Sequence, residues 1–168
     1  MHDRVASIIA LRGLMAVLAL TPGACKEADS DTAVAAGRSE VAYVVLRVTD
    51  LPRSEAFYRD ILGLRQAFRY EIGNGAVELA MGYPNASGVV TGAAIVLLYQ
   101  PNRAEPFAHG TSYNRYVLAV PDVQATFQRL TKLGLPGLRM PVRYERFNAI
   151  VGFATDPDGY TIEILQRI

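Results

Sequence analysis

The stretch GFATDPDGYTIEIL, residues 152–165, has the pattern of two β-strands joined by a tight turn. Residues 156–159, Asp-Pro-Asp-Gly, are those a type I turn favours, with a side-chain acceptor first, proline's fixed φ second and glycine last. Because side chains alternate along a strand, Glu163 lies on the face opposite to Ile162 and Ile164. The stretch therefore predicts a hairpin with a carboxylate in the middle of its second strand. Glutamate is seldom buried without a partner, so Glu163 is either an edge residue facing water or part of a polar site.

Composition limits both the kind of protein and the kind of partner. With 168 residues, 51% of them hydrophobic, the chain fits one globular domain with a short extension. The 17 Lys and Arg residues against 16 Asp and Glu leave a net charge of +1, which offers no basic surface for nucleic acid. Cys25 is the single cysteine, which excludes an intramolecular disulfide. The expected partner is a small molecule or another protein.

Residues 1–25 have the layout of a bacterial export signal. Arg4 and Arg12 precede an apolar segment at residues 13–20, and small residues lead up to Cys25. The apolar run is shorter than the roughly 20 residues that cross a membrane. This layout resembles a lipoprotein signal peptide, which implies a lipid on Cys25. Cleavage nearby by an ordinary signal peptidase and an uncleaved tail are the alternatives.

Residues 26–40 are polar, small and aperiodic, as expected for a flexible tether between an anchor and a domain. Together with the signal they predict a protein of the cell envelope, held on the periplasmic side of a membrane by its lipid anchor alone. Lys26 follows the cysteine, where aspartate would be the inner-membrane retention signal, so the outer membrane is the expected location.

The rest of the chain, residues 41–168, shows one pattern twice. In the first copy, a β-branched run over residues 41–48 is followed by Asp50 as a helix N-cap, an apolar helical face and Gly63 as a C-cap. Three further strands are predicted at residues 66–72, 76–82 and 93–100.

The second copy begins with a strand at residues 115–120, followed by Asp122 as the N-cap. Its helical face carries Val123, Phe127, Leu130 and Leu133, and its remaining strands are predicted at residues 140–146, 148–155 and 160–166. The repeat predicts an α+β domain of two βαβββ modules, the first module at residues 41–101 and the second at residues 113–168. The connection between them holds His109, which is expected to be an exposed loop residue.

The segments LRVTDLPRSEAFYRDILGL, residues 46–64, and FATDPDGYTIEIL, residues 153–165, resemble signatures of the vicinal oxygen chelate superfamily, in particular glyoxalase I and the bleomycin resistance proteins. The resemblance implies a fold in which two βαβββ modules curve a mixed sheet around a shared cavity, often completed by a homodimer. It also implies a metal held by one residue from the first and the last strand of each module.

The four metal positions of that family fall on Tyr43, Val96, Arg115 and Glu163. A divalent metal needs deprotonated N, O or S ligands, usually three or more from the protein. Valine offers no lone pair, and arginine is a permanent cation. Only Glu163 matches glyoxalase I, so we expect no metal and no other cofactor.

Arg115 and Glu163 are expected on neighbouring strands that face the cavity. They form either a structural ion pair or a pair that also receives a carboxylate, phosphate or enolate oxygen of a ligand. The resemblance further places Arg47 where glyoxalase I holds the glutamyl carboxylate of glutathione, with Gln100 beside it. The candidate ligand-binding residues are Tyr43, Arg47, Val96, Gln100, Arg115 and Glu163.

The sequence leaves three functions open. The first is a metal-free binding protein for a small anionic or aromatic molecule, similar to the superfamily's drug-sequestering resistance proteins. The second is a glyoxalase-like lyase or isomerase in which Glu163 is the catalytic general base, while Arg115 and Tyr43 stabilise an enolate oxygen. The third is a structural or partner-binding domain whose cavity has filled in.

Overall fold

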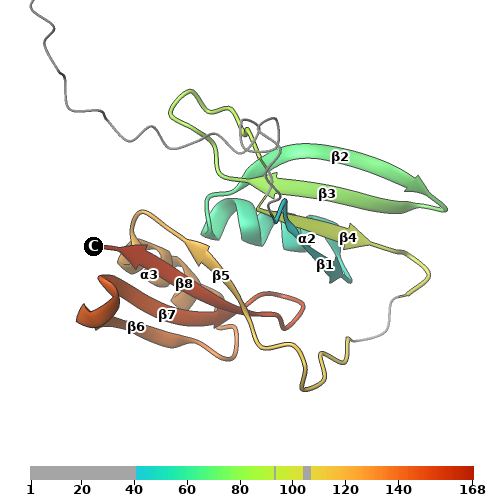
Figure 1. Ribbon diagram of the computed structural model, residues 1–168. Helices are drawn as coiled ribbons and strands as arrows, with labels where there is room; N and C mark the ends of the chain where they lie inside the picture. Colours follow the sequence, from blue (N-terminus) through green and yellow to red (C-terminus); the bar gives the residue numbers. More distant parts are fainter. Residues whose placement is uncertain (1–40, 93, 104–106) are drawn as a thin grey trace, which may run out of the picture.

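In the computed structural model of the protein, residues 41–168 are described, except residues 93 and 104–106. The predicted signal peptide, the tether and Cys25 lie outside the described residues. The described chain forms two four-stranded mixed sheets with few helices (Figure 1). The predicted α+β fold class is confirmed.

The first sheet has the strand order β1-β4-β3-β2. The elements of this module are β1 (Val44–Val48), α2 (Leu51–Ala56), the π-helical turn η1 (Phe57–Ile61), β2 (Arg65–Gly73), β3 (Ala76–Gly82) and β4 (Ile95–Tyr99). Strands β1 and β4 run parallel, whereas the β3–β4 and β2–β3 pairs are antiparallel.

The second sheet repeats this arrangement with the order β5-β8-β7-β6. Its elements are β5 (Tyr116–Ala119), α3 (Val123–Leu133), β6 (Arg139–Tyr144), the 3-10 turn η2 (Glu145–Phe147), β7 (Ala149–Thr155) and β8 (Thr161–Arg167). Strands β5 and β8 run parallel, and the other two pairs are antiparallel. The strand predicted at residues 140–146 ends earlier, at Tyr144, because the chain turns at η2 before β7.

Both helices begin at the predicted caps. The Asp50 carboxylate accepts a hydrogen bond from the Arg53 N–H at 3.0 Å, and Asp122 accepts one from the Ala125 N–H at 2.9 Å. Helix α3 ends at Gly134, which has a left-handed φ of 62°. The first helix was predicted as a regular helix, but its last turn, Phe57–Ile61, is π-helical.

Each sheet has one face covered by its helix and an opposite face, called the open face, on which several side chains are exposed. In the first module the covered face carries apolar residues such as Leu46, Leu79 and Leu97, which are buried. In the second module a Cβ atom at Gly152 would lie 2.3 Å from a ring carbon of Phe127 in α3, so only glycine allows this close approach. Among the described residues, the helices are too short or too polar to cross a membrane.

Candidate functional site

The predicted pair of Arg115 and Glu163 lies on the open face of the second sheet. Glu163 in β8 sits between Val117 of β5 and Phe153 of β7. The Arg115 Nε donates to the Glu163 carboxylate, and the Arg115 NH1 donates to the Asn114 side chain at 2.6 Å. The Glu163 side chain is 15% exposed and that of Arg115 is 43% exposed. The structure therefore brings these two residues together at the surface of the sheet, with the carboxylate the more buried partner.

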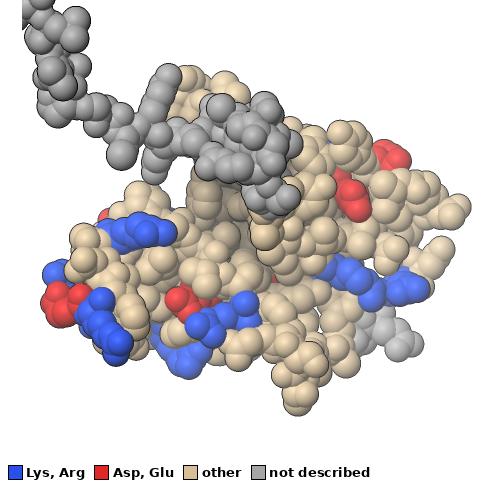
Figure 2. All heavy atoms as spheres, viewed as in Figure 1, with Lys and Arg blue, Asp and Glu red and all other residues tan. Residues whose placement is uncertain are grey.

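Aromatic and cationic groups surround this pair. The guanidinium carbon of Arg139 lies 3.9 Å from the centre of the Phe153 ring, and that of Arg115 lies 5.9 Å from the same centre. On the face of the molecule in Figure 2, acidic and basic side chains are interspersed over the second module. Glu163 thus lies beside two guanidinium groups and an aromatic ring.

The two family positions in the first module have a different character. Tyr43 is 44% exposed and contacts Phe68 edge to face, with ring centres 6.3 Å apart. Val96 is 1% exposed and pairs with Val45 and Ala80 on the neighbouring strands. These side chains present a phenol at the surface and an alkyl group in the interior.

A metal ion of the kind the superfamily holds does not fit the residues at these four positions. Valine has no donor atom, and the Arg115 guanidinium is a cation that occupies an oxygen of Glu163. Glu163 and the Tyr43 phenol remain, which is fewer than the three or more protein ligands that a divalent ion usually takes. Within residues 41–168, apart from the gaps at 93 and 104–106, no three His, Cys, Asp or Glu residues cluster to hold a metal.

Arg47 lines a cavity of about 500 Å³ next to the connection between the modules. Its other lining residues are Asn102, Arg103, Phe107, Ala108, His109 and Tyr160. The Arg47 guanidinium carbon lies 4.8 Å from the centre of the Phe107 ring. Burial raises the pKa of the Tyr160 phenol, and a hydrogen bond from the Arg47 backbone opposes the shift, so the phenol stays neutral and can donate a hydrogen bond. This lining suits an anion that carries a flat or apolar portion.

His109 differs from the sequence-based expectation of an exposed loop residue. Its Nε2 lies 2.9 Å from the Asp158 carbonyl oxygen, and its ring centre is 4.4 Å from that of Tyr160. The residue is partly buried because its side chain packs against the hairpin turn at residues 156–160.

Gln100 lines a second cavity of about 270 Å³, which shares Asn102 and Arg103 with the Arg47 cavity. Neither cavity is lined by Arg115 or Glu163. The six predicted ligand-binding residues therefore do not converge on one cavity within the described part of the chain.

Sequence reasoning did not identify Tyr160, His109, Phe107 or Arg103 as lining residues of the Arg47 cavity. Tyr160 directly follows the Asp-Pro-Asp-Gly turn, and this position in the sequence could have indicated that it is a lining residue. The other three belong to the connection, which carries no strand or helix pattern that could place their side chains.

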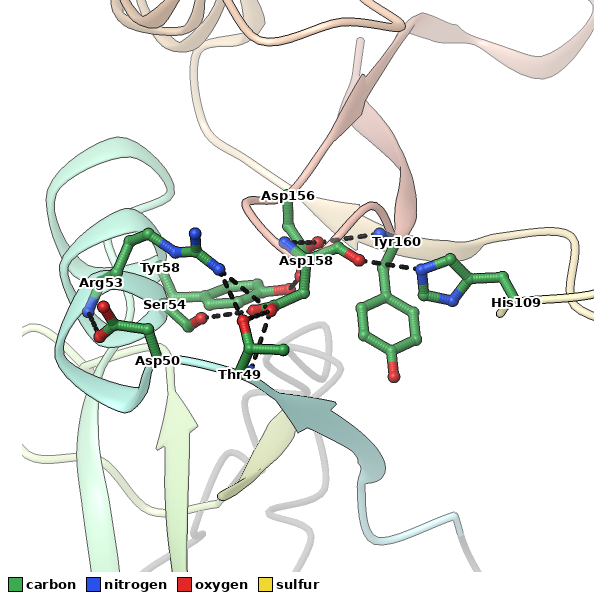
Figure 3. A network of polar contacts seen from close by, with 9 residues as sticks. All are labelled: Thr49, Asp50, Arg53, Ser54, Tyr58, His109, Asp156, Asp158 and Tyr160. Atoms are coloured by element: carbon green, nitrogen blue, oxygen red, sulfur yellow. Dashed lines mark hydrogen bonds and ion pairs between the residues drawn. The ribbon is translucent and has the colours of Figure 1, made fainter. Parts of the chain in front are cut away.

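The turn that follows β7 joins the two modules (Figure 3). One Asp158 carboxylate oxygen accepts hydrogen bonds from the Thr49 N–H at 2.9 Å, the Thr49 hydroxyl at 2.6 Å and the Arg53 NH2 at 3.1 Å. Its other oxygen accepts one from the Ser54 hydroxyl at 2.7 Å. The Asp158 side chain is completely buried. A carboxylate of the second module is thus held by the start of the first module's helix.

Asp156, at the other end of the same turn, has a buried network of its own. One carboxylate oxygen accepts from the N–H groups of Asp158 and Tyr160 at 2.9 and 2.8 Å. The other oxygen accepts from the Tyr58 hydroxyl at 2.7 Å, and that hydroxyl also bonds the Tyr116 hydroxyl. Burial raises the pKa of Asp156, against the hydrogen bond from Tyr58, and raises the pKa of Tyr58 and Tyr116 well above the usual value. The hydrogen bonds of the Asp156 and Asp158 carboxylates therefore hold the turn in place, and the turn positions Tyr160 in the Arg47 cavity.

Known proteins similar in sequence include two bacterial enzymes. The lactoylglutathione lyase of Haemophilus influenzae is 31% identical over 129 residues, which cover 76% of this chain and 93% of that protein. The probable lactoylglutathione lyase of Synechocystis is 29% identical over 125 residues, covering 74% of this chain and 92% of that protein.

Solved structures with the same fold include glyoxalase I of Leishmania major, with a TM-score of 0.59, 23% identity and coverage of 76% of this chain and 86% of that chain. The fosfomycin resistance protein of Listeria monocytogenes aligns with a TM-score of 0.52 and 14% identity, covering 77% of this chain and 94% of that chain. The model of the Glyoxalase/Bleomycin resistance protein/Dioxygenase superfamily matches residues 40–164. The chain belongs to this superfamily.

Proposed function

We propose that the protein binds a small anionic molecule in the Arg47 cavity and does so without a metal ion. The observation that carries the proposal is the lining of this cavity. Arg47 and Arg103 supply cationic groups, Tyr160 supplies a neutral hydrogen-bond donor, and Phe107 supplies an aromatic surface. Guanidinium groups bind carboxylates and phosphates through charge-assisted hydrogen bonds. A volume of about 500 Å³ lies within the range of small-molecule sites.

The absence of a metal is supported by chemistry at the four family positions. The Arg115 guanidinium stands beside Glu163 and neutralises the carboxylate that a divalent cation would otherwise neutralise. Protein purified from cells grown in medium supplemented with Zn, Ni, Mn and Fe should contain well under one equivalent of metal by elemental analysis. Chelator should leave its melting temperature unchanged, and stoichiometric metal that is lost in Glu163→Gln would refute this part of the proposal.

Calorimetric titration with inorganic phosphate and with glutathione tests the anion site. Arg47→Met should weaken binding of either probe at least tenfold, because it removes the charge from the cavity wall. Arg69→Met is the matched control, since Arg69 is an arginine of the same module that pairs with Glu71 outside the cavity. Equal affinities in the two variants, or no saturable binding of either anion, would refute the anion site.

A lyase or isomerase is the second candidate, favoured by the similarity to proteins named lactoylglutathione lyase. Glu163 would be the general base, with its free carboxylate oxygen taking a proton from a carbon acid, and Arg115 would stabilise the enolate oxygen. Turnover of the methylglyoxal–glutathione hemithioacetal by the wild type, lost in Glu163→Gln but kept in Glu145→Gln, would establish this function over simple binding. A domain with a filled cavity, the third hypothesis, does not account for the open space beside Arg47.

We also propose that the protein is exported and lipid-anchored in the cell envelope, facing the periplasm, with the outer membrane as its location. The support is the arrangement of charged, apolar and small residues before Cys25. Cys25→Ala should abolish acyl labelling and release the protein from the membrane fraction. Identical fractionation of this variant and the wild type would contradict the anchor.

A homodimer is proposed as well. The open faces of both sheets expose apolar residues, among them Val45, Tyr70, Val117 and Val142, and association would cover them. Sedimentation velocity at micromolar concentration should give the mass of two chains. A single-chain mass at all concentrations would contradict the dimer.

A further inference from the structure

The two helices end beside each other on the covered side of the molecule and leave a third cavity between the modules. Ile61 is the last residue of η1 and Leu133 is the last residue of α3, and both line this cavity. Phe57 forms part of its wall, and Pro157 of the hairpin turn contributes another part. We call this space of about 350 Å³ the helix-end cavity.

The apolar stripe of α3 explains why the cavity is apolar. Val123, Phe127 and Leu130 of this stripe are buried against the second sheet, whereas Leu133, one turn further, is 46% exposed. Leu133 continues the pattern that buries the rest of the helix, but it has the helix-end cavity beside it instead of a neighbouring side chain. The remaining lining residues are Arg53, Ala56, Asp60 and Leu135.

The π-helical turn supplies the opposite wall. Phe57–Ile61 departs from α-helical geometry, and such π turns are rare and frequently occur at functional sites. The carbonyl of Ile61 is not left open to the cavity, because the guanidinium of Arg129 donates to it twice, at 3.1 and 2.9 Å. The wall therefore shows side chains of Phe57 and Ile61 rather than unsatisfied backbone groups.

The charges at the rim are already paired within the protein. Arg53 donates to Asp158 at 3.1 Å, and Asp60 accepts from the Arg59 guanidinium at 2.8 and 2.9 Å. A charged ligand would have to compete with these partners, whereas an uncharged apolar ligand would not. The rim thus complements a neutral molecule.

Size restricts the occupant further. One turn of an α-helix, about 10 Å wide and 5.4 Å long, fills roughly 400 Å³, which exceeds the cavity. Pockets for small molecules start at roughly 300 Å³. We propose that the helix-end cavity binds an uncharged, mostly apolar molecule of one or two rings. This site is independent of the Arg47 cavity and of the Arg115 and Glu163 pair, with which it shares no lining residue.

The ligand would contact both modules, because the walls come from η1, from the end of α3 and from the turn after β7. Such a ligand binds only the docked arrangement of the modules and raises its stability by mass action. A small apolar molecule in this cavity would therefore strengthen the packing between the modules.

Titration of the isotope-labelled full chain with indole, followed by amide NMR, tests the proposal. Saturable shifts should be concentrated at residues 53–61 and 133–135 and at Asp156 and Asp158, which flank Pro157, and the melting temperature should rise with indole concentration. Leu133→Trp, which fills the cavity, should weaken indole binding at least tenfold. Val89→Trp is the matched control, because Val89 is an exposed apolar residue in the segment between β3 and β4 and does not line the helix-end cavity, and it should change the affinity less than twofold.

Indole-3-acetate, which adds a carboxylate to the same ring, should bind at least tenfold more weakly than indole. Equal or tighter binding would show that the site takes anions and would overturn the neutral class. Shifts centred elsewhere, no saturation by indole, or undiminished binding to Leu133→Trp would overturn the site itself. If the NMR spectrum of Leu133→Trp shows that this variant is unfolded, Leu133→Gln replaces it, because it makes the cavity wall polar without added bulk and should likewise weaken indole binding. Loss of a dimer in the Leu133 variants would assign the cavity to contacts between copies and would likewise overturn the proposal.

Discussion

The two modules share a topology but differ in how they contribute to the contact between them. In the second module, the turn between β7 and β8 carries Asp156 and Asp158, which reach into the first module. The corresponding segment of the first module, residues 83–94 between β3 and β4, contains no charged residue. The carboxylates therefore come from one module and most of their donors from the other. Duplication of the fold did not preserve symmetry in the polar contacts.

The helices show the same division of roles. Helix α3 buries Leu130 with the apolar stripe of its module, whereas the first helix buries Tyr58, whose hydroxyl donates to Asp156. The family positions also differ, because the second module pairs Arg115 with Glu163 where the first has the exposed Tyr43 and the buried Val96. Apolar packing on the covered face is common to both modules, while the polar groups have specialised.

The largest expected effect comes from removing Asp158, which would show how much of the stability depends on the one-sided contact. Asp158→Ala leaves the Ser54 hydroxyl and Thr49 without their acceptor and should lower the free energy of unfolding by about 3 kcal/mol. Urea unfolding measures the change. Asp60→Ala, at an exposed carboxylate paired with Arg59, is the control and should leave the midpoint unchanged. Similar losses in both variants would mean that the contacts of Asp158 between the modules stabilise the fold no more than an exposed ion pair does.

The next effect concerns helix packing, where the two modules use different residues. Gly152 pairs with Ile164 as Leu79 pairs with Leu97 in the first module. Gly152→Ala places a methyl group against Phe127 and should cost about 2 kcal/mol by overpacking.

A second change tests this reason. Phe127→Leu should cost less in the Gly152→Ala background than in the wild type, because it relieves the clash. Strictly additive losses in urea unfolding would argue that the strain lies elsewhere.

The pH dependence of stability tests the buried network around Asp156. Burial raises the pKa of this carboxyl above its usual 3.8 in the folded state. Between the unfolded and folded pKa values the native state holds a proton that the unfolded chain has released, so the free energy of unfolding falls as pH rises through this window. Asp156→Asn should flatten that fall in urea unfolding across the acidic range. Asp122→Asn, at the exposed cap of α3, should keep it, and an unchanged slope in Asp156→Asn would contradict the assignment.

The smallest effect is expected at the pair on the open face. Arg115→Met removes an ion pair whose arginine is 43% exposed in the single chain, so at concentrations where the chain is dissociated the loss should be about 0.5 kcal/mol, because water screens such pairs. Tyr43→Leu changes the position of the first module that corresponds to Arg115, and its free energy of unfolding is the comparison for Arg115→Met. A loss of more than about 2 kcal/mol in Arg115→Met would show that the open face is dry, as it would be if a partner chain covered it.

Local signals in the sequence were enough to predict the order of the helices and strands. Caps at Asp50 and Asp122 and the alternating patterns of the strands are local signals, because they depend on residues within a few positions of one another. They predicted the α+β fold and the starts of both helices. The pairing of Arg115 with Glu163 was implied by the resemblance to the superfamily and not by these local signals; Glu163 lies in β8 and Arg115 directly precedes β5. The π-helical turn at Phe57–Ile61 escaped prediction because its apolar positions also fit an ordinary helix.

The partners of the buried polar groups depend on how the two modules pack together. Asp158 bonds Thr49 and Ser54, more than a hundred residues earlier in the chain, and no local pattern encodes a contact of that separation. The same holds for the Arg47 cavity, whose wall combines β1, the connection and the turn after β7. A strand pattern specifies the face on which a side chain lies, but the neighbours of that face are specified by the docking of the two modules. That docking depends on the fit of complete surfaces and on the burial of Asp156 and Asp158 together with their donors.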